Sequence, residues 1–332
     1  MKTQAYAAQL ACGKLEVFEY NSGQLRPDEV EVHVKFCDIC HSDLSMLDNE
    51  WNITKYPLVP GLEIIGTVSE VGNDVKHLKV GQYVGIGWRA RSCLYCDQCM
   101  SGHHNRCLKG EDVIVGRHGG YADKVRCQAI FAFPLSPNID TRAAGPLFCG
   151  GITVFNPIIQ NNIRGTDHVA VVGIGGLGHM ALQFLNSWGC EITAFSANSE
   201  KEKDARKLGA HNFLNSRDPV AIKSATNSFD LVLVTANADL DWNAYLNTLK
   251  PGGKLHIVGA TPPVKVDVFA LIASERSIGG SPTGSPITIR MMLEFCNRHK
   301  ISPLVEEFPL SRVNEAMDHL KAGKARYRLV KK

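Results

Sequence analysis

The amino-acid sequence predicts an α/β protein in which a β-rich domain is followed by a doubly wound parallel sheet. A length of 332 residues suits two domains better than one. The first 150 residues carry alternating strand patterns and many glycines, whereas short apolar runs alternate with helical patterns from His168 onward. These three observations together predict the fold class.

The β-rich part is indicated by a clear strand pattern. Val30, Val32, Val34 and Phe36 alternate with polar residues, as expected for a half-buried strand. Glycines follow at short intervals between apolar runs such as EIIGTV and QYVGIG. Tight turns between short strands are typical of a small barrel or sandwich.

Strands and helices alternate in the second part. HVAVVG, EITAFS, DLVLVTA and KLHIVGA have the continuous apolar character of buried parallel strands. Ser199 and Glu202 are predicted to form a capping box, and Gly209 is predicted to end the helix that follows. After the first strand, apolar residues at helical spacing predict an amphipathic helix: Leu177, Met180, Ala181, Phe184, Leu185 and Trp188.

These patterns set the expected domain boundaries. Residues 1–150 form the β-rich domain, and residues 151–286 form the doubly wound domain. The tail, residues 287–332, contains a helical stretch and a final strand, and we expect it to return to the first domain.

Composition excludes several classes of protein. With 44% hydrophobic and 21% charged residues, the chain has the balance of a globular protein. A net charge of +3 gives no electrostatic case for nucleic acid or a membrane surface. The N-terminus lacks the apolar core of a signal peptide, so we expect a cytoplasmic protein. In a reducing cytosol, eleven cysteines indicate metal ligands or buried thiols.

A glycine-rich loop follows the first strand of the doubly wound domain. VVGIGGLG places Gly173, Gly175 and Gly178 at the spacing G-x-G-x-x-G, directly between a strand and a helix. In that context the glycines permit a tight turn, close approach of the backbone to a pyrophosphate, and close packing of helix on strand. The motif therefore predicts a dinucleotide cofactor, with a purely structural turn as the alternative.

The residues after the second strand favour NADP(H) over NAD(H). An NAD-binding protein places an acidic residue there to hold the ribose 2′-hydroxyl. This chain has Ser196, Asn198, Ser199 and Lys201 instead, and such groups suit a 2′-phosphate. In the alternative interpretation, Ser199 is only a helix cap and Lys201 a solvated surface charge.

Four closely spaced cysteines form the strongest motif in the chain. Cys93, Cys96, Cys99 and Cys107 can surround one Zn²⁺ ion tetrahedrally without a long loop. Because all four positions would be protein ligands, the site would be structural. The alternative is a loop with four reactive thiols, which a reducing cytosol disfavours.

Other reactive residues are dispersed. Cys40, Ser42 and Asp43 stand close together, Glu63 follows in VPGLEIIG, and Cys149 lies in LFCGGITVF. Spacing alone does not gather these residues into one site.

A series of ordered motifs carries a family resemblance over nearly the whole chain. DICHSDLS, YPLVPGLEIIG, the four-cysteine segment, GPLFCGGITVF, VVGIGGLG and ARYRLV occur in this order. The pattern resembles the zinc-dependent medium-chain alcohol dehydrogenases, in their cinnamyl alcohol dehydrogenase-like branch. LSMLDNEW, GIGWRARSC and CGGITVFNP look like the bacterial NADPH-dependent broad-range aldehyde reductases. The resemblance implies a GroES-like catalytic domain, with a structural zinc lobe at 93–107, split around a Rossmann NADP(H)-binding domain.

The resemblance also implies a catalytic zinc site. Cys40 and Cys149 match its two thiolate ligands, and Glu63 matches a neighbouring carboxylate that can move in as a ligand. Leu62 stands where the family has a histidine ligand, and Asp38 stands where it usually has glycine. Leucine has no donor atom, so we expect partial or absent metal at this site.

Further roles follow from the same resemblance. Ser42 matches the hydroxyl that relays a proton, Asp43 matches a residue that orients the site, and Ser45 stands where many relatives have the next histidine of the relay. The implied substrate pocket is lined by Trp51, Trp88 and Phe148. Thr153 would lie against the nicotinamide. The other implied cofactor contacts are His41, Gly173, Gly175, Gly176, Leu177, Gly178, Ser196, Asn198, Ser199, Lys201, Val258, Ser281 and Arg328.

These features predict a zinc-containing reductase that transfers hydride from NADPH to aldehydes, reversibly toward primary alcohols. One alternative is a zinc-depleted enzyme that acts like the zinc-free quinone reductases of the same superfamily. Another is a non-catalytic NADPH-binding protein, and a substitution introduced at Leu62 is a further explanation of that residue. In relatives, the last strand of the cofactor sheet pairs with its symmetry mate. This strand lies near 277–281 here, so we expect a homodimer.

Overall fold

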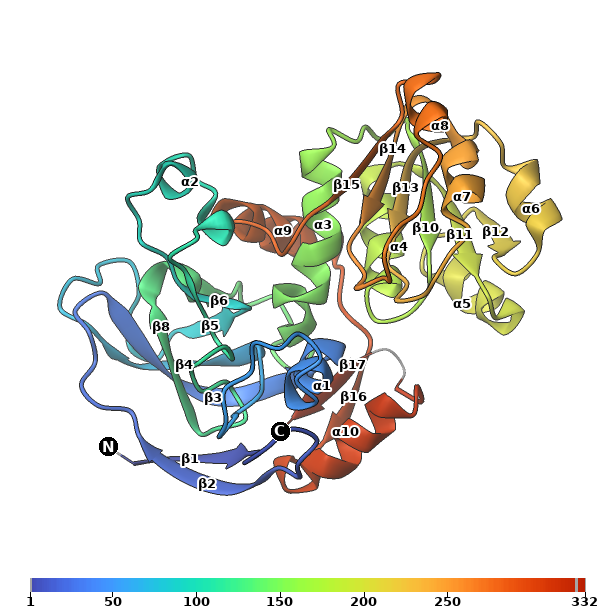
Figure 1. Cartoon of the computed structure of the whole chain (residues 1–332). Helices are drawn as coiled ribbons and strands as arrows, with labels where there is room; N and C mark the ends of the chain where they lie inside the picture. Colours follow the sequence, from blue (N-terminus) through green and yellow to red (C-terminus); the bar gives the residue numbers. More distant parts are fainter. Residues whose placement is uncertain (1, 326–327, 332) are drawn as a thin grey trace. The chain divides into compact units, whose positions relative to one another are not determined.

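The computed structural model describes residues 2–325 and 328–331, with side chains as far as residue 325 (Figure 1). Its contacts divide the chain into two compact units, Met1–Cys149 with Gly284–Lys332, and Gly150–Thr283. The predicted α/β class is confirmed, because one unit holds a mainly antiparallel sheet and the other a parallel sheet. In the part of the chain that the structure describes, no helix is long and apolar enough to cross a membrane.

The first unit is built on a seven-stranded sheet of order β16-β17-β3-β4-β5-β9, with β8 paired to β3. Its strands are β1 (Lys2–Ala7), β2 (Glu16–Asn21), β3 (Glu29–Ile39), β4 (Glu63–Val71), β5 (Tyr83–Ile86), β6 (Arg89–Arg91), β7 (Glu111–Asp112), β8 (Lys124–Gln128), β9 (Phe133–Pro134), β16 (Val305–Phe308) and β17 (Arg328–Lys331). Its helices are α1 (His41–Leu47), α2 (Asp97–Met100), η1 (His104–Arg106), η2 (Ala129–Phe131), η3 (Gly145–Phe148), α9 (Pro286–His299), η5 (Leu310–Arg312) and α10 (Val313–Lys321).

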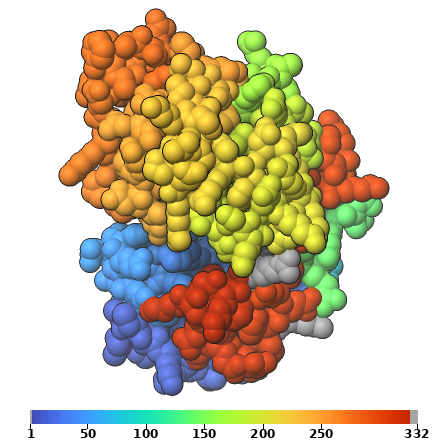
Figure 2. Space-filling view, turned by 90° about the vertical axis from the view of Figure 1, so that its right-hand side faces the viewer, coloured from blue at the N-terminus to red at the C-terminus, as the bar shows by residue number. Residues whose placement is uncertain are grey.

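The C-terminal segment is part of this first unit. Strand β17 pairs with β3, with Leu329 opposite Ile39, and helix α10 packs against α1 and β3. In the space-filling view the red surface of this segment lies against the blue surface of the N-terminal segments (Figure 2). Segments far apart in sequence therefore share one hydrophobic core.

Strand β3 departs from simple alternation at several positions, because Glu29, Glu31 and Asp38 are buried and Phe36 is only half-buried. Val30, Val32 and Val34 face the core as predicted, but Glu31 is also buried, at 2% exposure. Its carboxylate contacts Lys124 Nζ at 2.9 Å and Arg126 Nη2 at 2.7 Å, both from the neighbouring strand β8. Burial of this charge is compatible with folding because both cations compensate it.

The second unit is a parallel six-stranded sheet of order β12-β11-β10-β13-β14-β15. Its strands are β10 (His168–Val172), β11 (Glu191–Ser196), β12 (Asn212–Asn215), β13 (Phe229–Val234), β14 (Leu249–Ile257) and β15 (Ser277–Gly280). Its helices are α3 (Gly150–Gln160), α4 (Gly178–Trp188), η4 (Ser199–Lys201), α5 (Glu202–Lys207), α6 (Pro219–Ser224), α7 (Trp242–Thr248) and α8 (Val268–Ile272). The strand order reverses at β10, as in doubly wound folds.

Two local predictions can be compared with the helices of this unit. The apolar stripe of α4 is confirmed, since Met180, Phe184 and Leu185 are fully buried. The capping box at Ser199 is wrong. The side chain that caps the first turn is Asn198, which accepts a hydrogen bond from the backbone N–H of Glu200 at 2.9 Å.

Strand β15 forms one edge of the parallel sheet, at the position that the sequence predicted for its last strand. Helix α8 precedes it and exposes three large apolar side chains, Val268 at 62%, Phe269 at 71% and Ile272 at 69%. An unpaired strand edge together with exposed apolar side chains is a surface suited to a partner.

Candidate active site

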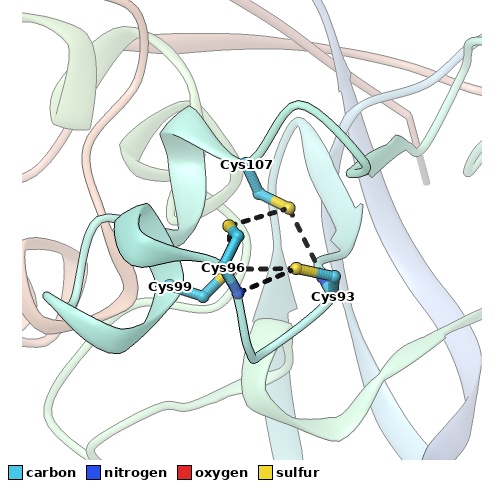
Figure 3. A group of neighbouring side chains, drawn as sticks. All are labelled: Cys93, Cys96, Cys99 and Cys107. Atoms are coloured by element: carbon cyan, nitrogen blue, oxygen red, sulfur yellow. Dashed lines mark hydrogen bonds between the residues drawn. The ribbon is translucent and has the colours of Figure 1, made fainter.

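The four cysteines of residues 93–107 converge on one point (Figure 3). Their sulfur atoms all lie within 4.8 Å of one another, and the pairs Cys93–Cys99, Cys96–Cys99 and Cys96–Cys107 are 3.9, 3.6 and 3.9 Å apart. Four sulfurs bound to zinc at about 2.3 Å would be roughly 3.8 Å apart in a tetrahedron. The distances are far above the S–S bond of a disulfide, about 2.05 Å. The cluster can therefore hold a structural zinc ion.

Local backbone structure builds this cluster. Cys96 precedes the single turn of α2 and Cys99 lies within it, which turns both thiols to one side. The backbone N–H groups of Cys96 and Cys93 point at sulfur, at 3.3 Å from Cys93 Sγ and 3.4 Å from Cys107 Sγ. Burial raises the pKa of the Cys93 thiol, but hydrogen bonds from the N–H groups of Tyr95 and Cys96 and from the thiols of Cys96 and Cys107 outweigh it and lower the pKa to about 6.

The structure brings the dispersed set together as a second cluster. Cys40 lies between β3 and α1, Glu63 begins β4, and Cys149 follows η3. One ligand atom from each lies within 4.8 Å of the other two. Cys40 and Glu63 are fully buried, and Cys149 is half-buried. The thiol of Cys149, burial, and the charges of Glu63 and Asp43 raise the pKa of Cys40 well above its ordinary value.

Asp43 holds two segments of this cluster in place. Its carboxylate accepts a hydrogen bond from the backbone N–H of Cys40 at 3.0 Å and another from that of Gly61 at 2.8 Å. It thereby links the start of α1 to the turn that leads into Glu63. Complete burial raises the pKa of Asp43 to about 7, although the two N–H groups act in the opposite direction.

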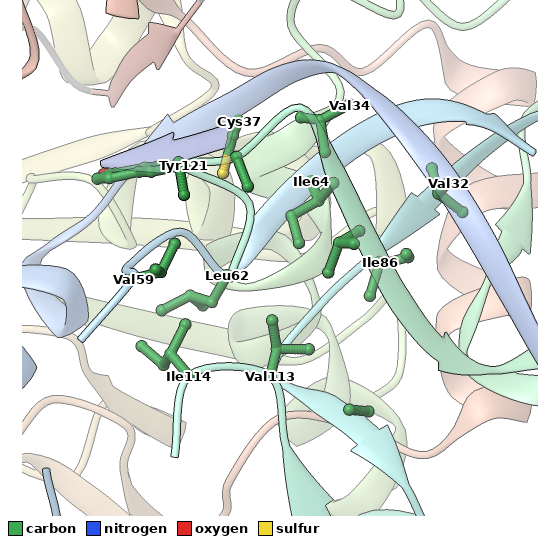
Figure 4. Close-up of a cluster of buried hydrophobic side chains, with 14 of the residues drawn as sticks. Val32, Val34, Cys37, Val59, Leu62, Ile64, Ile86, Val113, Ile114 and Tyr121 are labelled. Carbon is green, nitrogen blue, oxygen red and sulfur yellow. The ribbon is translucent and has the colours of Figure 1, made fainter. Parts of the chain in front are cut away.

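Leu62 lies in the hydrophobic core beside this cluster. Its side chain is completely buried in an apolar group that includes Val59, Val113 and Ile114 (Figure 4). In the family that the sequence resembles, this position carries a metal ligand, but here it holds an apolar leucine side chain. The cluster has two thiols and one carboxylate, without an imidazole.

Asp38 is a second departure close to the same place. It is fully buried and lies directly opposite Glu63 in the β3–β4 pairing. The absence of a side chain at Gly145 makes room for it, because a Cβ atom there would lie 2.6 Å from Asp38 Oδ2. A second carboxyl group thus accompanies Glu63 on this part of the sheet.

Helix α1 carries Ser42, which is expected to relay a proton, and Ser45, which stands where many relatives have the next histidine of the relay. Ser42 is half-buried, and Ser45 lies three residues further along the same helix. Residues at this spacing are neighbours on a helix surface. The Ser45 hydroxyl donates a hydrogen bond of 2.6 Å to Glu50, which is exposed. Sequence reasoning missed Glu50, because nothing in the spacing indicates that the chain turns back after the helix.

The structure brings two of the three predicted pocket aromatics together. The rings of Trp51 and Trp88 lie edge to face, with centroids 6.0 Å apart. Trp51 is 38% exposed, so the pair borders solvent. Phe148 is completely buried and stacks on Phe133, which makes it a core residue of the first unit.

The glycine loop of the second unit has the geometry of a dinucleotide-binding turn. Gly173 has φ of +95°, and a Cβ on Gly178 would lie 2.0 Å from the Gly173 carbonyl oxygen. A Cβ on Gly175 would meet nothing within 4 Å, so this side of the loop is open. Lys201 Nζ donates to the carbonyl oxygen of Ile174 at 2.7 Å and stands at the loop.

Other predicted cofactor residues lie at the ends of strands and helices. Ser196 ends β11, and its hydroxyl accepts a hydrogen bond from the N–H of Asn198 at 3.2 Å. The Ser281 hydroxyl is 2.9 Å from Nε2 of His256, a ring that is 2% exposed. Burial lowers the pKa of His256 to about 4, so this ring is neutral at pH 7.

The remaining predicted contacts occupy varied environments. Thr153 is buried within α3, and the backbone N–H of Val258 donates a hydrogen bond to the carbonyl oxygen of Val234. His41 is the exposed first residue of α1. Gly176 and Leu177 complete the loop before α4, and the side chain of Arg328 lies outside the described residues.

Comparison with known proteins identifies the family. Residues 26–137 match the family described as Alcohol dehydrogenase GroES-like domain. Residues 176–298 match the family described as Zinc-binding dehydrogenase. The sequence is 50% identical over 328 residues to the aldehyde reductase AdhA of Synechocystis, covering 98% of both chains. The chain belongs to the zinc-dependent alcohol dehydrogenase family.

More distant dehydrogenases share the whole architecture. A probable cinnamyl alcohol dehydrogenase of Arabidopsis thaliana is 37% identical, over 98% of this chain and 92% of its own. The solved cinnamyl alcohol dehydrogenase SbCAD4 of Sorghum bicolor is 32% identical, with a TM-score of 0.95 over 100% of this chain and 97% of its own. A Helicobacter pylori CAD structure, titled as a complex with NADP(H), is 28% identical, with a TM-score of 0.92 over 100% of this chain and 98% of its own. The predicted family resemblance is confirmed.

Proposed function

We propose that this dehydrogenase reduces aldehydes to primary alcohols with NADPH, reversibly, at a zinc ion held by Cys40, Glu63 and Cys149. One observation carries the proposal. Three potential metal ligands converge within 4.8 Å in a chain that is 50% identical to an aldehyde reductase. Residues this far apart in sequence do not converge on a metal-sized space by local structure alone.

The donor set suits zinc. Thiolate sulfur and carboxylate oxygen are both common zinc ligands, and catalytic sites use three protein ligands with one position left for substrate. A zinc ion bound there would polarise the substrate oxygen as a Lewis acid. Asp43 supports the set by fixing the backbone at Cys40 and Gly61.

The proton that reaches the substrate oxygen would travel along α1. Ser42 would donate it, and Ser45 with Glu50 would connect this hydroxyl to solvent. The 2.6 Å contact between Ser45 and Glu50 supports this route, because it leads from a buried hydroxyl to an exposed carboxylate.

NADPH would bind the second unit with its pyrophosphate at Gly173–Gly178. The cofactor supplies the hydride that reduces the carbonyl carbon. Lys201 would hold the 2′-phosphate together with Ser196, Asn198 and Ser199. The half-buried ammonium group at the loop supports this assignment, as does the complex of the Helicobacter pylori relative with NADP(H).

The remaining cofactor contacts belong to the same proposal. The open side of the loop at Gly175 leaves room for the pyrophosphate, with Gly176 and Leu177 beside it. Contacts to the rest of the cofactor would come from His41, Thr153, Val258, Ser281 and Arg328.

The substrate body would pack against the edge-to-face pair Trp51 and Trp88, which favours apolar and aromatic aldehydes. Phe148 would support this wall from the core rather than contact substrate. The named relatives, which are aldehyde reductases and alcohol dehydrogenases, do not favour a non-catalytic or quinone-reducing protein.

The proposal includes the domains and the assembly. Residues 1–150 and 287–332 would form the catalytic domain, and residues 151–286 the cofactor domain. The edge strand β15 and the exposed side chains of α8 support a homodimer in which two β15 strands pair. Free cysteines throughout the described residues are compatible with the cytosol.

Replacement of Cys149 by serine tests the proposed site. With benzaldehyde as the probe and added zinc, we expect Cys149→Ser to lower NADPH oxidation by about 100-fold or more, while NADPH binding is unchanged. Cys190→Ser, a buried thiol of the other unit, is the matched control and should keep its rate. An unchanged rate in Cys149→Ser would contradict the proposed zinc site.

Cofactor choice is tested separately. Ser196→Asp places a carboxylate at the end of β11, where it should repel the 2′-phosphate and favour NADH. Titration of both cofactors should show a reversed preference, whereas Ser228→Asp, at a distant turn of the same unit, should not alter it. Tighter binding of NADH than NADPH by the unmodified protein would contradict the assignment.

A further inference from the structure

A separate pocket lies in the first unit, in the region where β2 ends and β8 begins. Its volume is about 370 Å³, near the lower end of the range for small-molecule sites. None of its lining residues belongs to either metal-ligand set or to α1. The proposed function gives this pocket no role.

Basic side chains dominate the lining. Arg26, Arg117, Lys124 and Arg126 line the pocket, and Glu29 is its one acidic lining residue. Two buried carboxylates keep the cations ordered. Glu31 contacts Lys124 at 2.9 Å and Arg126 at 2.7 Å, and Glu29 lies 3.9 Å from Arg117. Glu111, which does not line the pocket, pairs with Arg117 as well.

The aromatic residues Tyr20 and His118 form another part of the wall. Their ring centroids are 4.2 Å apart, and Phe18 packs against the same imidazole at 5.9 Å. Nδ1 of His118 is buried and has no hydrogen-bond partner among the described residues. Burial and the charge of Arg117 lower the pKa of His118, so the ring is neutral at pH 7.

The arrangement combines basic side chains, which ion pairs with Glu29, Glu31 and Glu111 hold in place, with an aromatic wall. Arginine and lysine recognise phosphate and carboxylate oxygens, and aromatic rings pack against flat ligands.

We propose that this pocket binds a small organic anion, whose phosphate or carboxylate group contacts the basic side chains and whose flat body packs on Tyr20 and His118. The site is separate from the proposed active site, so it does not depend on the proposed function.

Calorimetric titration of the zinc-replete protein tests this site. Saturating NADPH occupies the proposed cofactor site, phenyl phosphate is the anionic probe, and phenol is its uncharged counterpart. We expect one phenyl phosphate per chain and at least about ten-fold weaker binding of phenol. Benzoate in place of phenyl phosphate distinguishes carboxylate from phosphate recognition. No binding of either anion would overturn the proposal, and so would equal affinity for phenol or for inorganic phosphate.

Two variants locate the binding. Arg26→Ala removes a cation that is 55% exposed and makes only long contacts, at 3.7 Å and beyond, so the fold should persist. His118→Leu removes the polar ring atoms but keeps an apolar wall. Each should weaken phenyl phosphate binding about ten-fold.

The matched control is Arg312→Ala, which removes an equally exposed and ion-paired arginine outside the pocket, and it should leave affinity unchanged. Lys201→Ala alters the proposed cofactor site and should also leave the affinity for phenyl phosphate unchanged. The proposal would be overturned if Arg312→Ala or Lys201→Ala lost phenyl phosphate binding while Arg26→Ala kept it.

Discussion

The two metal-ligand clusters of the first unit differ in how they are built. The lobe 93–107 takes all four ligands from one short segment, which a single helical turn brings together. The other cluster, called the assembled cluster below, takes Cys40, Glu63 and Cys149 from three separate parts of the chain. Its geometry depends on the pairing of β3 with β4 and on Asp43 between two backbone segments.

This difference explains why one cluster can lose a ligand. Within residues 93–107 only Cys99 and Cys107 are buried, so the segment has almost no apolar core and the metal itself has to stabilise it. Around Leu62 a large apolar core already holds the chain in place, and the leucine adds to that core. A missing ligand should therefore cost stability in the lobe and affinity or activity in the assembled cluster.

The largest expected effect is in the lobe. Cys96→Ser should remove one zinc per chain and lower the free energy of unfolding by roughly 3 kcal/mol, or about 10 °C in melting temperature. Zinc content and thermal unfolding measure this. Cys12→Ser, an exposed cysteine outside both clusters, should change neither. Unchanged zinc and unchanged stability in Cys96→Ser would show that the lobe does not depend on metal.

Restoring an imidazole tests the assembled cluster. Leu62→His should tighten zinc binding there about 100-fold, equivalent to roughly 2.7 kcal/mol, and raise aldehyde reduction. Zinc per chain should rise toward two, measured with the rate at equal protein, saturating NADPH and added zinc.

Stability provides the control for Leu62→His. A histidine inserted into a fully buried apolar position without a metal should destabilise the fold. With a chelator present, the melting temperature of Leu62→His should therefore be lower than that of the unmodified protein. Added zinc should make the melting temperature of Leu62→His the higher of the two. If the unmodified protein already binds two zinc ions and Leu62→His leaves the rate unchanged, the site does not need that ligand.

A smaller effect is expected at Asp43. Asp43→Asn keeps the size of the side chain but offers only one oxygen to the N–H groups of Cys40 and Gly61. Zinc affinity of the assembled cluster should fall about ten-fold, while the lobe retains its zinc. Competition with a zinc indicator measures the zinc affinity of each cluster separately. Equal loss from both clusters would indicate general unfolding instead of misplaced ligands.

The smallest expected effect is the order in which the two clusters release zinc. Under a mild chelator, the assembled cluster should lose its metal first, because two thiolates and a carboxylate bind zinc less firmly than four thiolates. The first release should abolish aldehyde reduction and leave the melting temperature nearly unchanged. Loss of the lobe zinc first, seen as an early fall in melting temperature, would contradict this ranking.

Some of this protein could be predicted from sequence because the signals are local. The apolar stripe of α4, the glycine loop with Gly173 at positive φ, and the four cysteines depend on residues only a few positions apart. Local spacing determines which side of a helix or turn a residue faces. Such features can therefore be predicted without knowing how the rest of the chain folds.

Tertiary structure decided the features that join distant segments. The convergence of Cys40, Glu63 and Cys149, the pairing of Ser45 with Glu50, and the buried ion pairs of Glu31 all depend on strand pairing and chain reversal. Alternation alone assigned Glu31 to the polar face, since no local pattern shows that Lys124 and Arg126 lie on the adjacent strand. The physical reason is that burial of a charge or placement of a ligand is determined by whichever groups packing brings near, and sequence spacing does not carry that information.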